Sequence, residues 1–139
     1  MRDRLLGGGH GLTLDDLYVD VSIGPIGADT DGATRTAVEA IGRIGADAGW
    51  AGAHFCVGLS NIGAGLPRKT ASGLALRPLI ESAFLTLTVP LGLDSVVAAA
   101  GRKLELLPED HPVLVGFREA LALEGVHTVM RIRDIYRNG

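Results

Sequence analysis

Two kinds of periodicity alternate along this chain, and their alternation restricts the fold more than any other feature. Apolar runs, each containing β-branched residues, predict buried strands at 16–23, 53–60 and 93–100. Apolar side chains at helical spacing predict helices at 33–49, 78–89, 112–125 and 126–137. The order β-α-β-α-β-α-α with short crossovers requires an α/β fold with parallel strands and right-handed connections.

The ends of the predicted elements are marked by capping and turn residues. Thr30 or Asp31 is expected to cap the helix at 33–49, and Gly49 to end it. Pro78 is expected to open the next helix, where its missing N–H does no harm. The strand at 53–60 is apolar at nearly every position, which is typical of a parallel strand covered on both faces.

The number of predicted strands is too small for a closed barrel. Eight strands need about 250 residues, and an open doubly wound sheet usually has about five strands, whereas 139 residues supply three. Residues 1–12 contain a glycine-rich stretch without the Lys-Ser/Thr of a phosphate-binding loop, and are interpreted as a flexible lead. Residues 13–139 are therefore expected to form about half of a larger barrel domain.

Charge and cysteine content exclude several classes of function. A net charge of -3 with mixed signs gives no basic stripe, so neither nucleic acid nor an anionic membrane is an expected partner. Cys56 is the single cysteine, which favours a reducing cytoplasm and excludes a disulfide framework within one chain. The four histidines lack ligand spacing, so no metal site is expected. No apolar run is long enough to span a bilayer without interruption.

Polar residues stand where the predicted strands end, the position at which α/β folds bind ligands. Asp20 lies in an otherwise apolar strand, and a buried carboxylate there must find hydrogen-bond donors, either from a ligand or from a loop N–H or arginine. Ser60 and Asn61 follow the second strand, where they could contact a ligand or form a turn and cap. Arg68 and Lys69 could fix an anion or solvate a loop.

An ordered set of segments resembles one family. The segments are "DLYVD", "VGLSN", "GLPRK", "ESAFLTL", "PLGLDSVV" and "LLPEDHPVLVGFREAL". Together, from about Thr13 onward, they resemble the C-terminal half of the pterin-binding methyltransferases, which move a methyl group between methyltetrahydrofolate and a corrinoid protein. The resemblance implies a dihydropteroate synthase-like fold, a partial (β/α)8 TIM barrel with a C-terminal β-α-β-α-β-α-α half. It implies methyltetrahydrofolate as substrate and cobalamin carried by a corrinoid-binding partner protein.

The resemblance also implies roles for individual residues. Asp20 corresponds to the aspartate that hydrogen-bonds the pterin ring, and Asn61 to the catalytic asparagine beside N5 of the folate. Ser60 precedes Asn61 in the same "GLSN" motif and is expected in the pterin pocket. Arg68 and Lys69 fall where related enzymes keep basic residues near the pterin or its acidic tail. Asp20 and Asn61 are thus expected at the same end of neighbouring strands.

The chain also departs from the family. Val21 stands in place of a proline, and Ala99–Ala100 in place of Asn-Pro. The early strands, which carry another aspartate and asparagine of the pocket, are missing, so a complementing N-terminal half or a homo-oligomer is expected. A rival interpretation is a non-catalytic, self-associating half barrel. A third is a dihydropteroate synthase relative, although its strand-end Ser-Arg-Lys is replaced here by 60–62, Ser-Asn-Ile.

Overall fold

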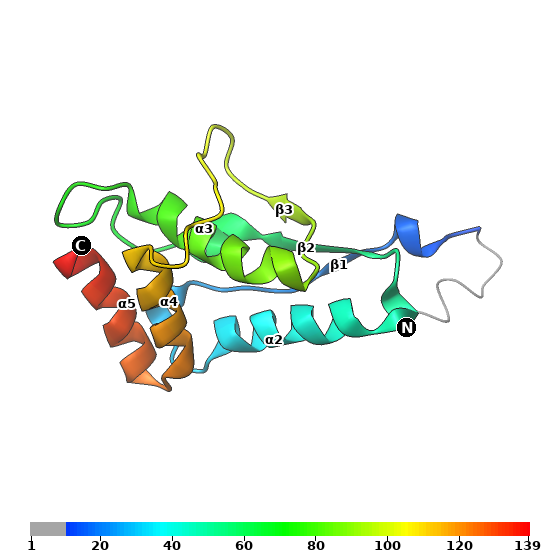
Figure 1. The fold of residues 1–139 in the computed structure, drawn as a ribbon, viewed down its shortest axis with the longest axis horizontal. Helices are drawn as coiled ribbons and strands as arrows, with labels where there is room; N and C mark the ends of the chain where they lie inside the picture. The colour runs from blue at the N-terminus through cyan, green and yellow to red at the C-terminus, as the bar shows by residue number, and fades with distance from the viewer. Residues whose placement is uncertain (1–10) are drawn as a thin grey trace.

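A computed structural model of the chain describes residues 11–139; residues 1–10 of the predicted lead lie outside this range. Its strands form one parallel sheet in the order β1-β2-β3, with bounds Tyr18–Asp20, His54–Gly58 and Ser95–Val97. Helix α2 (Ala33–Ala46) connects β1 to β2, and α3 (Leu76–Thr88) connects β2 to β3 (Figure 1). The predicted α/β class and the parallel, side-by-side strands are confirmed.

Two further helices pack against each other near the carboxyl ends of the strands. They are α4 (Pro112–Ala122) and α5 (Val126–Asn138), close to the predicted bounds. Helix α4 also contacts α3, and α5 contacts the short 3-10 turn Ile26–Ala28 that follows β1 (Figure 1). This helical hairpin therefore supports the turn that follows the carboxyl end of β1.

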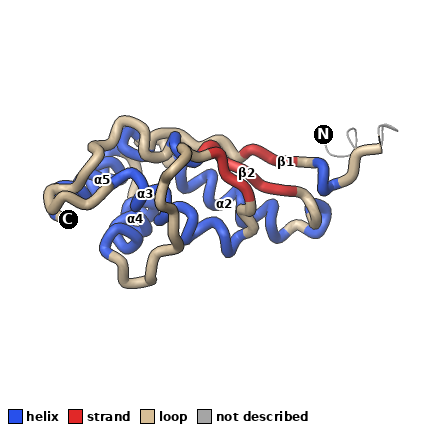
Figure 2. The backbone as a smooth tube through the Cα atoms, turned by 90° about the horizontal axis from the view of Figure 1, so that it is seen from above, coloured by secondary structure: helices blue, strands red, loops and turns tan. Residues whose placement is uncertain are grey.

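The helices of this chain cover one face of the sheet. Phe55 and Val57 of β2 are buried in a core that includes Ile41 of α2 and Phe84 of α3. Crossovers of the same hand place both connecting helices on the same side of the strands, and Figure 2 shows β1 and β2 side by side. The expectation that β2 would be covered on both faces is thus wrong for the described residues.

The opposite face carries the alternate side chains of the three strands, and we call it the open face. By register and alternation its members come from β1, β2 and β3: Tyr18, Asp20, His54, Cys56, Gly58, Ser95 and Val97. Tyr18 is 61% exposed and Val97 is 72% exposed, although both are large apolar residues within strands. Their exposure indicates a surface that another element could cover.

Several predicted boundaries differ from the structure for local reasons. The strands at 16–23 and 93–100 are each three residues long, because β1 follows the 3-10 turn Leu14–Asp16 and β3 runs into the turn at 98–101. Helix α2 ends at Ala46, because the Asp47 side chain accepts the N–H of Gly49 in a separate turn. Helix α3 begins two residues before Pro78, which still lies within the first turn.

Gly32 occupies the N-cap position of α2, and the side chain that satisfies the first helical turn is that of Asp29, not of Thr30 or Asp31. One Asp29 carboxylate oxygen accepts the N–H of Ala33 and the other accepts that of Thr34, both at 2.8 Å. Gly32 has a φ of 74°, and this left-handed turn returns the chain so that residue 29 faces the first helical turn. Burial alone would raise the pKa of Asp29, but the donors of Thr34, Ala33 and Gly32 hold it below its ordinary value.

The contact between α2 and the turn Val89–Leu91 provides a matched test of this packing. A Cβ on Gly45 would lie 2.1 Å from the Leu91 backbone oxygen, whereas a Cβ on Gly42 would lie 3.6 Å from a Leu91 methyl group. Gly45→Ala is therefore expected to destabilise the fold by about 1–3 kcal/mol in urea unfolding. Gly42→Ala should be neutral or stabilising, because alanine favours helix. Equal effects of the two substitutions would contradict the close approach of α2 to this turn.

None of the helices within 11–139 is both long and apolar enough to cross a membrane.

Candidate functional site at the carboxyl ends of the strands

Asp20 and Asn61 lie at the same end of neighbouring strands. Asp20 is the last residue of β1, and Asn61 ends the 3-10 turn Leu59–Asn61 that directly follows β2. Because β1 and β2 are parallel, both residues follow the carboxyl ends of their strands. Asp20 is the register partner of Cys56, which places it on the open face.

The Asn61 amide folds back over the end of its own strand. A Cβ built on Gly58 would lie 2.9 Å from Asn61 Nδ2, which is closer than side chains normally approach. Gly58 belongs to the open face by alternation along β2, so the amide lies on the same face as Asp20. A glycine at 58 is what permits this position of the Asn61 side chain.

The Asp20 side chain is exposed, which corrects the expectation of a buried carboxylate. The side chain projects from the open face of the sheet rather than toward a neighbouring strand, so it is left in contact with solvent. Within the described residues its carboxylate makes no hydrogen bond or ion pair. Burial raises the pKa of Cys56, and the nearby charges of Asp20 and Asp94 raise it further, so the thiol remains protonated. Asp20 therefore has free acceptor oxygens, and Cys56 is not an activated nucleophile.

Ser60 links the ends of β2 and β3. Its hydroxyl oxygen accepts the N–H of Ala99 at 3.1 Å. Ser60 therefore caps no helix of the described residues, and its oxygen instead holds the loop after β3, while the hydroxyl proton remains able to donate. Ser60 thus helps to fix the turn that presents Asn61.

Arg68 and Lys69 lie on an exposed loop, and the structure does not bring them into contact with Asp20 or Asn61. Lys69 forms an isolated backbone bridge with Ala75, and the Arg68 carbonyl accepts the N–H of Leu76 at the start of α3. The tip of the loop is attached to α5, where the N–H of Ala71 donates to the Tyr136 carbonyl. Neither cation forms an ion pair in the described part of the chain.

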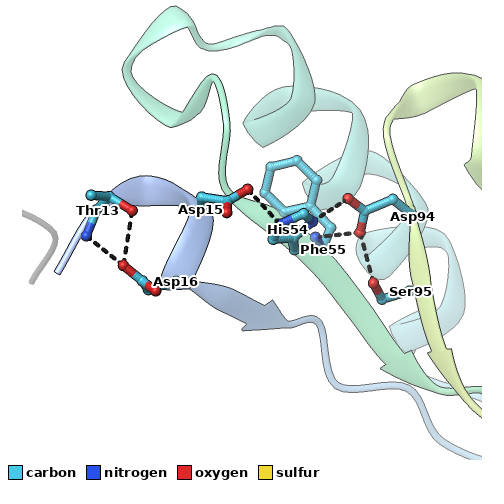
Figure 3. A network of polar contacts seen from close by, with 7 residues as sticks. All are labelled: Thr13, Asp15, Asp16, His54, Phe55, Asp94 and Ser95. Atoms are coloured by element: carbon cyan, nitrogen blue, oxygen red, sulfur yellow. Dashed lines mark hydrogen bonds and ion pairs between the residues drawn. The ribbon is translucent and has the colours of Figure 1, made fainter.

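A second polar cluster lies on the open face at the amino end of β2, and sequence reasoning missed it. His54 Nδ1 is 2.7 Å from an Asp94 carboxylate oxygen, and His54 Nε2 is 3.2 Å from Asp15 (Figure 3). Carboxylates only accept hydrogen bonds, so both bonds form together only when both ring nitrogens carry a proton, and the two carboxylates therefore favour the imidazolium form of His54. The Tyr18 ring stacks on the imidazole with centroids 4.7 Å apart.

Asp94 holds this cluster to the sheet. Its second oxygen accepts the N–H of Phe55 and the hydroxyl proton of Ser95. Burial opposes ionisation, but the bonds from His54, Ser95 and Phe55 lower the pKa of Asp94 below its ordinary value. The signal in the sequence was an aspartate shortly before each neighbouring strand, where parallel strands bring their amino ends together.

The imidazolium predicts a pH dependence of stability. The hydrogen bond to Asp94, and secondarily that to Asp15, raise the pKa of His54 above its ordinary 6.5, although burial opposes them. A raised native pKa gives stability that is complete below pH 6.5 and is lost as pH rises through the native pKa. As the pH rises above 6.5, the urea midpoint should therefore fall more steeply in wild type than in His54→Gln. His127→Gln, at an exposed position, is the control and should show the same pH dependence of the urea midpoint as wild type. If the urea midpoint of wild type changed with pH as little as that of His54→Gln, the result would contradict the cluster.

Glu81 and Arg102 fix the segment that follows β3. The Glu81 side chain on α3 is fully buried, and Arg102 Nη1 lies 3.3 Å from its Oε1 without hydrogen-bond geometry. Burial raises the pKa of Glu81, and the charges of Arg102 and Arg77 oppose that rise. Nearby, the N–H of Glu105 donates to the Ser82 hydroxyl oxygen on α3. The pair therefore positions the loop after β3 and does not face a strand-end ligand.

A separate cavity of about 400 Å³ lies between the loop at 70–74, the start of α4 and the end of α5. Neither Asp20 nor Asn61 lines it.

Among residues 11–139, no group of three His, Cys, Asp or Glu side chains is arranged to hold a metal ion. Comparison with models of protein families finds no match to this chain, and comparison with curated proteins finds none either.

Proposed function

We propose that this chain is the pterin-binding part of a methyltransferase that moves a methyl group between methyltetrahydrofolate and the cobalt of a corrinoid protein. The observation that carries the proposal is the placement of Asp20 and Asn61 on one face, at the carboxyl ends of adjacent parallel strands. The resemblance of "DLYVD" and "VGLSN" to the family assigns these same two residues to the pterin pocket.

The architecture supports a sector of a (β/α)8 barrel. A barrel strand has helices on its outer side and side chains filling the interior on the other. Here α2 and α3 cover one face, while the open face and the outer edges of β1 and β3 lack cover from the described residues. Further strands, supplied by another segment or chain, would close the barrel over the open face.

The two strand-end side chains have complementary tasks. The Asp20 carboxylate has unoccupied oxygens that can accept the paired N–H donors of a pterin ring. The Asn61 amide can hydrogen-bond N5 as that nitrogen gains a proton and the methyl group leaves, stabilising the transition state without being a strong acid. The corrinoid cobalt, held by the partner protein, is the methyl acceptor.

The remaining predicted residues have supporting roles in this proposal. Ser60 fixes the turn that carries Asn61 and can donate its proton to the ligand. Arg68 and Lys69, which are exposed, are available to the acidic tail of the folate. Cys56 is a free thiol, which suits a reducing compartment such as the cytoplasm.

A non-catalytic, self-associating half barrel is the second candidate. It is favoured by the exposure of Tyr18 and Val97 on the open face and by the unpaired edges of β1 and β3. The two candidates differ in gene context, because an enzyme requires the missing strands and a corrinoid-binding protein to be encoded in frame or nearby. A dihydropteroate synthase relative is the third candidate, and the Ser60-Asn61-Ile62 sequence disfavours it.

The direct test is reconstitution. The chain is co-expressed with the early-strand half of a family methyltransferase, and demethylation of methyltetrahydrofolate is followed with cob(I)alamin as acceptor. Methyl transfer that requires both halves supports the enzyme. A well-folded complex that neither binds methyltetrahydrofolate nor transfers its methyl group overturns the proposal and leaves the half barrel.

A further inference from the structure

The 400 Å³ cavity beside α5 has the size and lining of a small-molecule site. Its walls are mostly apolar, formed by Leu74, Pro112, Val113 and Ile135. Val113 and Ile135 are buried, whereas Leu74 is 53% exposed and stands at the rim. The loop that closes one side is attached to α5 through the N–H of Ser72 and the Gly139 carbonyl. The cavity is therefore built by three segments that are fixed to one another.

The charged side chains around the cavity differ in whether they have a partner of opposite charge. Arg131 is neutralised by Glu119, whose Oε2 accepts a hydrogen bond from Nε of the guanidinium at 2.7 Å and lies 2.7 Å from Nη2 in an ion pair. His111 Nδ1 accepts the N–H of Val113, so that nitrogen offers no proton to a ligand. Asp134 also lines the cavity, and within the described residues its carboxylate makes no hydrogen bond or ion pair. The charge left without a partner is negative.

We propose that this cavity binds a small apolar ligand that carries one ammonium group. The apolar part fills the space against Val113 and Ile135, and the ammonium group pairs with the Asp134 carboxylate at the rim. A carboxylate ligand would be repelled by the Asp134 carboxylate, and Arg131 could not compensate because it is already paired with Glu119. An anionic ligand is therefore disfavoured. The site is independent of the strand-end residues and of the proposed methyl transfer.

The experiment compares three ligands that share a phenyl ring but differ in charge. Binding of 2-phenylethylamine, 2-phenylethanol and phenylacetate to the 139-residue chain is measured by titration of ¹⁵N-labelled protein. The amine is expected to bind about fivefold more tightly than the alcohol, as an exposed ion pair of about 1 kcal/mol gives. Phenylacetate is expected to bind more weakly than the alcohol.

Two variants and one control localise the site. Asp134→Asn should remove the preference for the amine and leave alcohol binding unchanged, whereas Glu39→Gln, which changes the net charge equally on α2, should preserve the preference. Leu74→Trp changes an exposed position where folding is not at risk. Its larger side chain should fill the mouth of the cavity and weaken the binding affinity of all three ligands about tenfold. Absence of binding at millimolar amine, tighter binding of phenylacetate, or an amine preference that survives Asp134→Asn would each overturn the proposal.

Discussion

Asn61→Ala is expected to slow methyl transfer roughly ten- to a thousandfold in a barrel completed by the missing strands, which is the range for loss of one transition-state hydrogen bond. The Asn61 amide is the group placed over the end of β2, and alanine would remove the hydrogen bond that we propose it makes to N5, without altering the turn at 59–61. Because the hydrogen bond strengthens as N5 becomes protonated, kcat should fall more than KM rises. Stopped-flow absorbance of the corrinoid measures this step.

Two further substitutions separate catalysis from binding. Asp20→Asn should mainly raise KM for methyltetrahydrofolate, because in the proposed pocket its oxygens bind the pterin ring rather than the reacting nitrogen. Asn138→Ala makes the same chemical change as Asn61→Ala far along the chain, on α5, and should leave transfer unchanged. Unchanged kinetics for both Asn61→Ala and Asp20→Asn would show that the strand ends are not the pterin pocket.

Gly58 offers an independent way to displace the same amide. Alanine at 58 would place a Cβ 2.9 Å from Asn61 Nδ2, so the amide must move while its chemistry is preserved. A rate loss in Gly58→Ala that approaches that of Asn61→Ala would show that the position of the amide matters, and not merely its presence.

The second large expected effect concerns the chain by itself: no measurable methyl transfer, and a dimer or larger species in sedimentation. Three parallel strands leave two edges of unpaired backbone groups, and Tyr18 and Val97 expose apolar surface on the open face. A second copy could cover these groups, but it would bring together two copies of the same half pocket. The early-strand pterin ligands would still be absent.

A lysine placed on the edge strand tests whether this edge mediates association, and a lysine placed on a helix is the matched control. Val97→Lys changes an exposed residue of the edge strand β3 and should shift the species toward monomer, because lysine on an edge opposes pairing. Val115→Lys changes an exposed valine on α4 and should leave the sedimentation unchanged. A clean wild-type monomer at micromolar concentration that transfers methyl groups would refute both parts of this prediction.

The sequence alone was sufficient for the order of elements and for the parallel sheet. Alternating periodicities specify where strands and helices form, and the handedness of short crossovers then leaves few arrangements of three strands. It also placed Asp20 and Asn61 at the same strand ends, since residues that follow parallel strands emerge on one edge. These are properties of the backbone that do not depend on which side chains meet.

Tertiary structure decided the contacts that join residues far apart in the chain. His54 pairs with Asp94, 40 residues later, and Glu81 with Arg102, and no local pattern encodes either partner. The left-handed turn at Gly32 made the Asp29 side chain, in place of those of its neighbours, the one that satisfies the first turn of α2. Asp20 is exposed because the helices pack on the other face of the sheet, which depends on how the elements are arranged rather than on the run of residues around Asp20. Local sequence therefore determines secondary structure and strand ends, whereas burial and pairing depend on the three-dimensional positions of the elements.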